Sequence, residues 1–536
     1  MDTKLKEIEI FDSTLRDGAQ GEGISFSVQD KLDIVRLLDD LGVKYIEAGN
    51  PGSNPKDLEF FEKASRFELK HSKLVAFGST RRKGITAQQD SNLAALIGAG
   101  TEYVAVFGKC WKLHVTEIIN TTVEENLNMI YDTCKYLCDN GKRVTFDAEH
   151  FFDGYKNDRE FALKALQSAV NGGAECLALC DTNGGSFPDE MYDIVSDVRN
   201  HFPDVKISIH AHNDRGMAVA NSVMAVKAGA VQVQGTYLGY GERCGNANLS
   251  TIIPDLTLAG YSCIPEDKLK EVTATARELA EISNTSIKRG EPFIGISAFA
   301  HKAGMHADGV LKLPRSFEHV PPETFGNTRR FLMSEISGRG AVLERIRKID
   351  PSIQKNSEET SAILEALKRM EQQGYQYEGA DSSLEMLIRR SLGKYKPFFE
   401  LKNYKIISGR PCENDDCSAT ATVKVSVDGK DQLMVAEGNG PISAMDRALR
   451  RALEVFYPTL RNVRLIDYKV RVMDPKSATA ATVRVLITST DGRNVWTTVG
   501  VSGDVVEASR IALAESIEYH LIRKYGVDTD KSTMNE

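Results

Sequence analysis

KISIHAHND, at residues 206–214, is a short run with two isoleucines at alternate positions that ends in a cluster of polar side chains. The pattern is typical of a strand in a parallel sheet that carries functional groups at its carboxyl end. The first half of the chain holds further runs of this kind, each separated from the next by enough residues for one helix. Together the eight runs cover residues 7–12, 43–47, 73–78, 103–108, 143–149, 176–182, 206–212 and 231–238. We therefore predict the α/β class and a (β/α)8 TIM barrel.

The segment between the first two runs supports this prediction. Residues 27–41, SVQDKLDIVRLLDDL, have the apolar spacing of a helix, start at the plausible N-cap Ser27 and precede Gly42. The same alternation of strands and helices could also build a doubly wound open sheet, which remains the alternative at this point.

The chain has 536 residues, which is too long for a single core. We expect a catalytic barrel at residues 1–285, a helical connector at 286–395 with helices at 357–373 and 382–392, and a C-terminal domain at 396–530.

The C-terminal domain contains an internal repeat. ATVKVSV at residues 421–427 is matched by ATVRVLI at 481–487, and each run precedes an Asp-Gly turn, a second strand, a glycine-containing bend and a helix. We expect an α+β domain of duplicated ββα units. Because neither half clusters histidine, cysteine or carboxylate side chains, its role is regulatory or oligomerising rather than catalytic. Its glycine-rich bends are either turns or an effector site.

Composition narrows the choice of partners. The formal net charge is -8, and no long run of like charge marks a nucleic-acid or membrane surface. The N-terminus shows no apolar leader, and no stretch offers about 18 uninterrupted apolar residues. We expect a cytoplasmic protein that binds neither nucleic acid nor membrane.

Polar residues at the ends of three strands form a candidate metal site. His210 and His212 are two residues apart and so point to the same side of their strand. Asp17, with Arg16 beside it, follows the first strand, and Asn246 lies in the glycine-rich loop after the eighth. These four potential ligands suit a divalent ion such as Mg2+, Mn2+ or Zn2+. The alternatives are a surface ion pair and hydrogen-bonded core histidines.

Such a site leaves two positions of an octahedral ion for substrate oxygens. A 2-oxo acid offers a carboxylate and a carbonyl oxygen in one plane, and chelation of both polarises the carbonyl carbon. Arg16 would then stabilise the alkoxide that develops.

The strands at 143–149 and 176–182 also end in polar residues. Asp147 and Glu149 share one face of their strand, and Thr182 closes the next strand. These candidate substrate-binding residues can supply hydrogen bonds or proton transfer near the metal, although a merely structural polar layer is the alternative.

Three sequence motifs follow one another along the chain: DSTLRDG at 12–18, HAHND at 210–214 and GERCGNAN at 241–248. They resemble signature sequences of the metal-dependent Claisen-condensing synthases, the isopropylmalate, homocitrate and citramalate synthase family. That family also carries a connector and a duplicated regulatory domain, so the resemblance covers nearly the whole chain. It implies an acyltransferase with acetyl-CoA as co-substrate.

Carried over by position, the resemblance implies that Asp17, His210 and His212 bind the metal, with Asn246 in or near the coordination shell. It implies that Arg16 faces the substrate carbonyl and that Glu149 and Thr182 belong to the pocket for the 2-oxo acid.

GMHADG, at residues 304–309, resembles a family motif whose histidine reaches the barrel of a partner subunit and assists deprotonation of acetyl-CoA. The resemblance thus implies a homodimer and makes His306 a catalytic residue with Arg16 and Glu149. Phe317 stands where related synthases commonly have a tyrosine. Either that hydroxyl is dispensable, or a water or a neighbour such as His319 replaces it.

Several segments resemble most the branch of the family that condenses pyruvate with acetyl-CoA in isoleucine biosynthesis; they cover residues 11–27, 49–57, 77–84, 107–115 and 147–156. The resemblance implies isoleucine as the effector of the C-terminal domain. The alternatives are synthases that use 2-oxoisovalerate or 2-oxoglutarate and, less favoured, a carbon–carbon lyase like HMG-CoA lyase, which generally ends soon after its barrel.

Overall fold

The computed structural model describes residues 5–301, 304–331, 339–354, 357–409, 418–473, 481–492 and 494–526. The chain divides into two compact units. The first combines residues 1–300 with 318–330, and the second combines residues 301–317 with 331–536.

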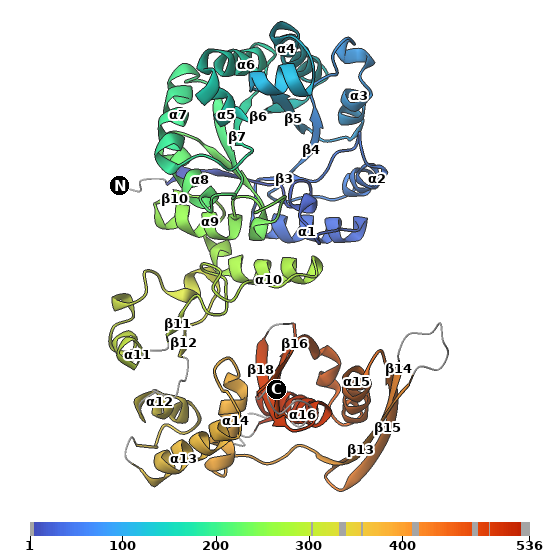
Figure 1. Ribbon diagram of the computed structural model, residues 1–536, viewed down its shortest axis with the longest axis vertical. Coiled ribbons are helices and arrows are strands. Elements are labelled where there is room, and N and C mark those ends of the chain that lie inside the picture. Colours follow the sequence, from blue (N-terminus) through green and yellow to red (C-terminus); the bar gives the residue numbers. More distant parts are fainter. Residues whose placement is uncertain are drawn as a thin grey trace. The chain divides into compact units, whose positions relative to one another are not determined.

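Parallel strands of the first unit close into a barrel in chain order (Figure 1). They are β2 (Glu9–Asp12), β3 (Tyr45–Glu47), β4 (Lys73–Ser79), β5 (Tyr103–Lys109), β6 (Arg143–Glu149), β7 (Cys176–Asp181), β8 (Lys206–Ala211) and β9 (Gln232–Gly235). Each strand coincides with one of the eight predicted runs to within a few residues. The predicted TIM barrel is therefore confirmed, and the open doubly wound sheet is wrong. Two further short strands, β1 (Lys6–Glu7) and β10 (Tyr261–Ser262), pair outside the barrel.

Helices alternate with these strands and surround the barrel (Figure 1). They are α1 (Val28–Leu41), α2 (Pro55–Ala64), α3 (Ser91–Gly98), α4 (Val123–Asp139), α5 (Phe151–Asn157), α6 (Arg159–Asn171), α7 (Pro188–His201), α8 (Ala218–Lys227) and α9 (Leu249–Leu258), and α10 (Val272–Ile282) follows. The first helix begins as predicted, because the Ser27 hydroxyl accepts a hydrogen bond from the Asp30 amide and the Asp30 carboxylate accepts one from the Ser27 amide. It ends at Gly42, whose φ of 93° is left-handed.

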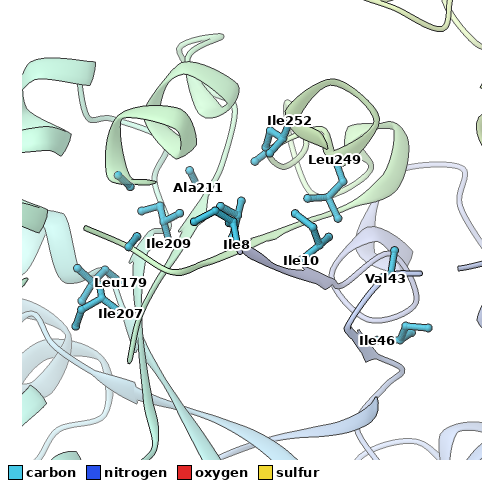
Figure 2. Packing of buried hydrophobic residues seen from close by; sticks show 14 of the residues in the cluster. Ile8, Ile10, Val43, Ile46, Leu179, Ile207, Ile209, Ala211, Leu249 and Ile252 are labelled. Atoms are coloured by element: carbon cyan, nitrogen blue, oxygen red, sulfur yellow. The ribbon is translucent and has the colours of Figure 1, made fainter. Parts of the chain in front are cut away.

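The outer face of the barrel strands packs against helices, whereas the inner face lines the barrel interior. Ile10, Ile46, Ile207 and Ile209 are completely buried on the outer face of the barrel and belong to the same apolar cluster as Leu249 of α9 (Figure 2). The alternate residues point into the barrel, and at its carboxyl end several of them, such as Asp147 and His210, are polar. The helices therefore stabilise the barrel from outside and leave its inner end free for chemistry.

The segment after α10 contributes to both units. It contains the strands β11 (Ala300–His301) and β12 (Arg330–Phe331) and the helices α11 (Gly304–Lys312), α12 (Arg339–Ile349), α13 (Glu358–Gln372) and α14 (Asp381–Ser391). The last two confirm the helices predicted at 357–373 and 382–392. Buried Ile346, Ile363 and Leu384 of α12, α13 and α14 share a cluster with Val499 of the C-terminal domain. The boundary expected at residues 395/396 stays a prediction.

The C-terminal domain confirms the internal repeat and extends it. One half consists of β13 (Glu400–Gly409), β14 (Ser418–Val427), β15 (Lys430–Gly438) and α15 (Pro441–Glu454), and the other consists of β16 (Arg464–Val472), β17 (Val483–Thr490), β18 (Val495–Ser502) and α16 (Val505–Tyr525). Each half is thus a three-stranded antiparallel sheet with one helix, and the expected ββα unit lacked its first strand. Most side chains of β13 and β16 are at least partly exposed, which leaves no clear apolar alternation in the sequence.

Within the described residues, no helix is both long enough and apolar enough to cross a membrane.

Candidate active site

Strand register brings the predicted residues together at the carboxyl end of the barrel. Parallel pairing places Cys180 of β7 beside His210 of β8, and His210 beside Gln234 of β9. Side chains paired in this way point to the same face of a sheet. His210 therefore enters the barrel interior between two neighbours, and His212 follows it on the same face.

Asp17 meets both histidines. Its Oδ2 atom lies 3.2 Å from His210 Nε2 and 3.7 Å from His212 Nε2. The two Nε2 atoms are 3.2 Å apart. All three side chains are buried, so the alternative of a surface ion pair for Asp17 is wrong. Among the described residues, this trio offers potential ligand atoms that all lie within 4.8 Å of one another.

A second layer of hydrogen bonds orients His210. Its Nδ1 atom lies 3.1 Å from Gln234 Oε1, while Gln234 Nε2 donates to Asp147 Oδ1 at 3.2 Å. Because the amide nitrogen of Gln234 is engaged by a carboxylate, its oxygen is left to accept a proton from Nδ1 of His210. The Nε2 lone pair of His210 then points toward Asp17, which is the tautomer a metal ligand requires.

Burial and charge shift the pKa values of the cluster. Burial, followed by the neighbouring His210, lowers the pKa of His212 to about 4. Burial alone would raise the pKa of Asp17, but Arg16 and the two histidines hold it well below its usual range. Burial, followed by the charge of Glu47, raises the pKa of Asp147 to about 7.

Asn246 completes a donor set that fits a cation. It forms a β-bridge with His212, and its side-chain Nδ2 donates to the Tyr240 carbonyl oxygen at 3.0 Å. The buried Oδ1 atom of Asn246 has no hydrogen-bond partner among the described residues. A buried oxygen without a hydrogen-bond partner is unfavourable unless another group, such as a metal ion, binds it. Two imidazole nitrogens, one carboxylate and one amide oxygen suit a divalent metal ion.

Arg16 is fixed next to this cluster. Its Nε atom donates to Glu47 Oε2 at 2.6 Å, and its Nη1 atom lies 3.4 Å from Asp17 Oδ1. The Ser13 hydroxyl donates to the same Glu47 oxygen at 2.5 Å. The guanidinium carbon lies 3.8 Å from the centre of the Phe77 ring. These contacts hold the positive charge of Arg16 beside the candidate metal site. Some N–H groups of its guanidinium have no partner among these contacts and stay able to donate hydrogen bonds.

Glu149 and Thr182 lie at the ends of neighbouring strands. The Glu149 carboxylate forms an ion pair with Lys109 at the end of β5. The Thr182 hydroxyl accepts a hydrogen bond from the backbone amide of His150 at 2.9 Å. Both residues thus belong to the rim on which Asp147 and the histidines converge.

His306 belongs to the second compact unit. Its exposed ring stacks on Phe317, with 4.5 Å between ring centres. His319, suggested as a substitute for the missing tyrosine hydroxyl, belongs to the first unit and packs against Phe293 and Phe299. The role of His306 across subunits stays a prediction.

Family models match three consecutive parts of the chain. Residues 7–285 match the HMGL-like family, residues 293–375 match the homocitrate synthase post-HMGL domain-like family, and residues 378–521 match the LeuA allosteric (dimerisation) domain.

Two relatives match along their whole length. An (R)-citramalate synthase of Aquifex aeolicus (strain VF5) is 49% identical over 97% of this chain and 98% of its own length. One of Synechocystis sp. (strain ATCC 27184 / PCC 6803 / Kazusa) is 47% identical over 97% of each. The chain belongs to the (R)-citramalate synthase family. Relatives named 2-isopropylmalate synthase are more distant, at 29–31% identity.

Solved structures are similar to about half of the chain. An HMG-CoA lyase of Bacillus subtilis superimposes with a TM-score of 0.46 and 21% sequence identity, covering 53% of this chain and 95% of that chain.

The structure adds residues to this member of the citramalate synthase family that sequence reasoning missed. Glu47 ends β3 and could have been found by the same rule that found Asp147, namely a carboxylate at the end of a barrel strand. Gln234 and Ser13 gave no such signal, because neutral side chains at these positions are ordinary and their partners are 24 and 34 residues away in sequence.

We expect Asp17→Ala and His212→Ala to weaken Mn2+ binding at least ~10-fold, because each removes one ligand of the candidate site. Arg16→Ala should bind Mn2+ with similar affinity, since Arg16 is a neighbour and not a ligand. Isothermal titration of metal-free protein measures both effects. Unchanged Mn2+ affinity in Asp17→Ala would rule out this ligand set.

Proposed function

We propose that this protein is a metal-dependent (R)-citramalate synthase that condenses acetyl-CoA with pyruvate and releases CoA. The convergence of Asp17, His210 and His212 beside Arg16 carries the proposal, since it suits polarisation of a 2-oxo acid. Full-length similarity to (R)-citramalate synthases favours pyruvate over the larger acceptors.

Asp17, His210, His212 and Asn246 would hold the divalent ion. When bound, the ion supplies a Lewis acid that polarises the ketone of the acceptor. Nothing in the donor set selects one metal among Mg2+, Mn2+ and Zn2+.

The remaining steps use the protein's own side chains. Arg16, held by Glu47, stabilises the negative charge that develops on the ketone oxygen after attack. The Thr182 hydroxyl and the Glu149 carboxylate hold the acceptor, and Asp147 lines the same layer. His306 of the partner subunit assists removal of a methyl proton from acetyl-CoA, the resulting enolate attacks the ketone carbon, and water cleaves the thioester.

Two aromatic rings limit the size of the acceptor. Phe77 of β4 and Phe107 of β5 stack with 5.5 Å between their centres, and the Arg16 guanidinium covers Phe77. Both are inward positions of their strands, at the carboxyl end of the barrel. This pair places bulky apolar side chains next to the residue that faces the ketone. It suits the methyl group of pyruvate better than a branched chain.

The C-terminal domain serves regulation and dimer formation. Ile407, Leu433 and Val435 are 51–59% exposed on one face of the first sheet, whereas α15 covers the other face. Exposed apolar residues on one sheet face support an interface with a second copy. His306 lies in the same compact unit as both sheets. An effector such as isoleucine that binds this unit could therefore change the position of His306 without acting through the barrel.

The purified protein with Mg2+ or Mn2+ and acetyl-CoA should release CoA with pyruvate and more slowly with 2-oxobutanoate, 2-oxoisovalerate and 2-oxoglutarate. Thiol release measures the rate, and metal-free protein is the control. No metal-dependent release with any acid would refute the proposed synthase, and release with 2-oxoisovalerate alone would replace pyruvate as the acceptor.

Phe107→Ala should raise kcat/KM for 2-oxobutanoate relative to pyruvate by about tenfold or more, because one extra methylene is worth about 1–3 kcal/mol in a fitted apolar site. Phe67→Ala is the matched control, since Phe67 packs on the barrel exterior. If the ratio of the two kcat/KM values is unchanged in Phe107→Ala, the aromatic pair does not determine the size of the acceptor.

Isoleucine should inhibit the full-length enzyme at concentrations at which leucine and valine do not. The inhibition should leave Mn2+ affinity unchanged, because the metal ligands belong to the other compact unit. Rate measurements with each amino acid, together with metal titration, test this expectation. Equal inhibition by leucine would contradict isoleucine as the effector.

A further inference from the structure

His150 joins β6 to α5 in an unusual conformation. Its φ of 55° and ψ of 33° lie in the left-handed region, which residues other than glycine rarely adopt. The proposed chemistry gives this residue no role. The left-handed turn directs the backbone N–H of His150 at Thr182 Oγ1, 2.9 Å away.

The imidazole of His150 is held by two aromatic neighbours. It lies 4.1 Å from the ring of His114 and 5.8 Å from that of Trp111, and those two rings stack on each other. His150 is 8% exposed. The ring cannot leave this stack without losing packing on two sides, so the stack stabilises the strained backbone.

Thr182 is held from a second direction as well. Its carbonyl oxygen accepts a hydrogen bond from Arg243 Nη2 at 2.8 Å, and Arg243 is in turn paired with Asp214. β7 and β8 end side by side, with Asp181 beside Ala211, so Thr182 and His212 are each the first residue after their strand. Both the main chain and the side chain of Thr182 are therefore held by hydrogen bonds at the carboxyl end of the barrel that carries the candidate metal site.

The bond from His150 decides what the Thr182 hydroxyl can do. A threonine hydroxyl has one proton to donate and lone pairs that accept. Because the His150 amide occupies one lone pair, the hydroxyl proton is left for a different partner. In the proposed function, the carboxylate of the 2-oxo acid would supply that partner.

We infer that His150 is a positioning residue that orients the Thr182 hydroxyl to donate to the carboxylate of the acceptor. The inference rests on the proposed placement of Thr182 in the acceptor pocket. It assigns the aromatic stack of Trp111, His114 and His150 to substrate binding and not to proton transfer. His150 itself contacts the substrate at no step.

Variants of His150 test the inference through KM and kcat separately. His150→Val should raise KM for pyruvate about tenfold or more and change kcat less than about threefold, because a β-branched residue resists the left-handed conformation. His150→Asn should raise KM only about threefold, as loss of the stack in His114→Ala does, and leave kcat unchanged, since asparagine tolerates that conformation. Pyruvate titration of the Mn2+-loaded enzyme should show the same order.

Thr182 provides the matched partner for a double-mutant cycle. Thr182→Val should raise KM for pyruvate as His150→Val does, and the double variant should be no worse than Thr182→Val alone. Additive effects of the two substitutions on KM, or a wild-type KM in His150→Val, would overturn the inference. If His150→Val fails to fold, His114→Ala removes the stacking partner and should raise KM about threefold with kcat unchanged; an unchanged KM there would also overturn it.

The experiments distinguish failure of the inference about His150 from failure of the proposed function. If pyruvate supports no CoA release in the wild type, or if Thr182→Val leaves KM unchanged, the placement of Thr182 is at fault. Asp428→Val controls for strain alone, because Asp428 is also left-handed but lies in a hairpin of the C-terminal domain. Its KM for pyruvate should match that of the wild type.

Discussion

The pairing of His210 with Cys180 on one side and Gln234 on the other is the constraint on which the site depends. A shift of one residue in this register would turn both histidines away from the barrel interior. Closure of the barrel forbids such a shift, because β8 is bonded on both edges and has its apolar residues packed against helices. The position of the two histidines in the candidate metal site is thus a consequence of barrel closure.

Charge at this end of the barrel would favour a bound cation. Asp17, Glu47 and Asp147 are buried in one layer, and Arg16 is the cation in contact with the first two. Burial, followed by the charge of Glu47, raises the pKa of Asp147 to about 7, because taking three carboxylates out of water against one guanidinium is unfavourable. A divalent ion at Asp17 and the two histidines would offset it. The same field that stabilises the ion would then act on the substrate ketone.

The sequence predicted the barrel well because each strand is a short, largely apolar run followed by a helical segment. It predicted the histidines of the candidate metal site because histidines two apart on a strand share a face. The sequence did not reveal the residues that hold the site residues in position. Gln234, Ser13 and His150 act through partners 24 to 34 residues away in sequence, and only the closed barrel brings those partners within hydrogen-bond distance. The strands β13 and β16 escaped prediction for a different reason. Their inward apolar residues are only partly buried, and a register shift near the start of each strand interrupts the alternation.

The division of the chain into two compact units bears on how such an enzyme is regulated. The candidate metal ligands, Arg16 and Thr182 are all in the first unit, while His306 and the duplicated sheets are in the second. In the proposed mechanism, inhibition would not require any distortion of the barrel, whose closed hydrogen bonding resists deformation. It would require only that an effector favour an arrangement of the second unit in which His306 cannot assist proton removal. The proposed acceptor site would then stay in the closed barrel, and the unit that contains His306 would be the one open to control.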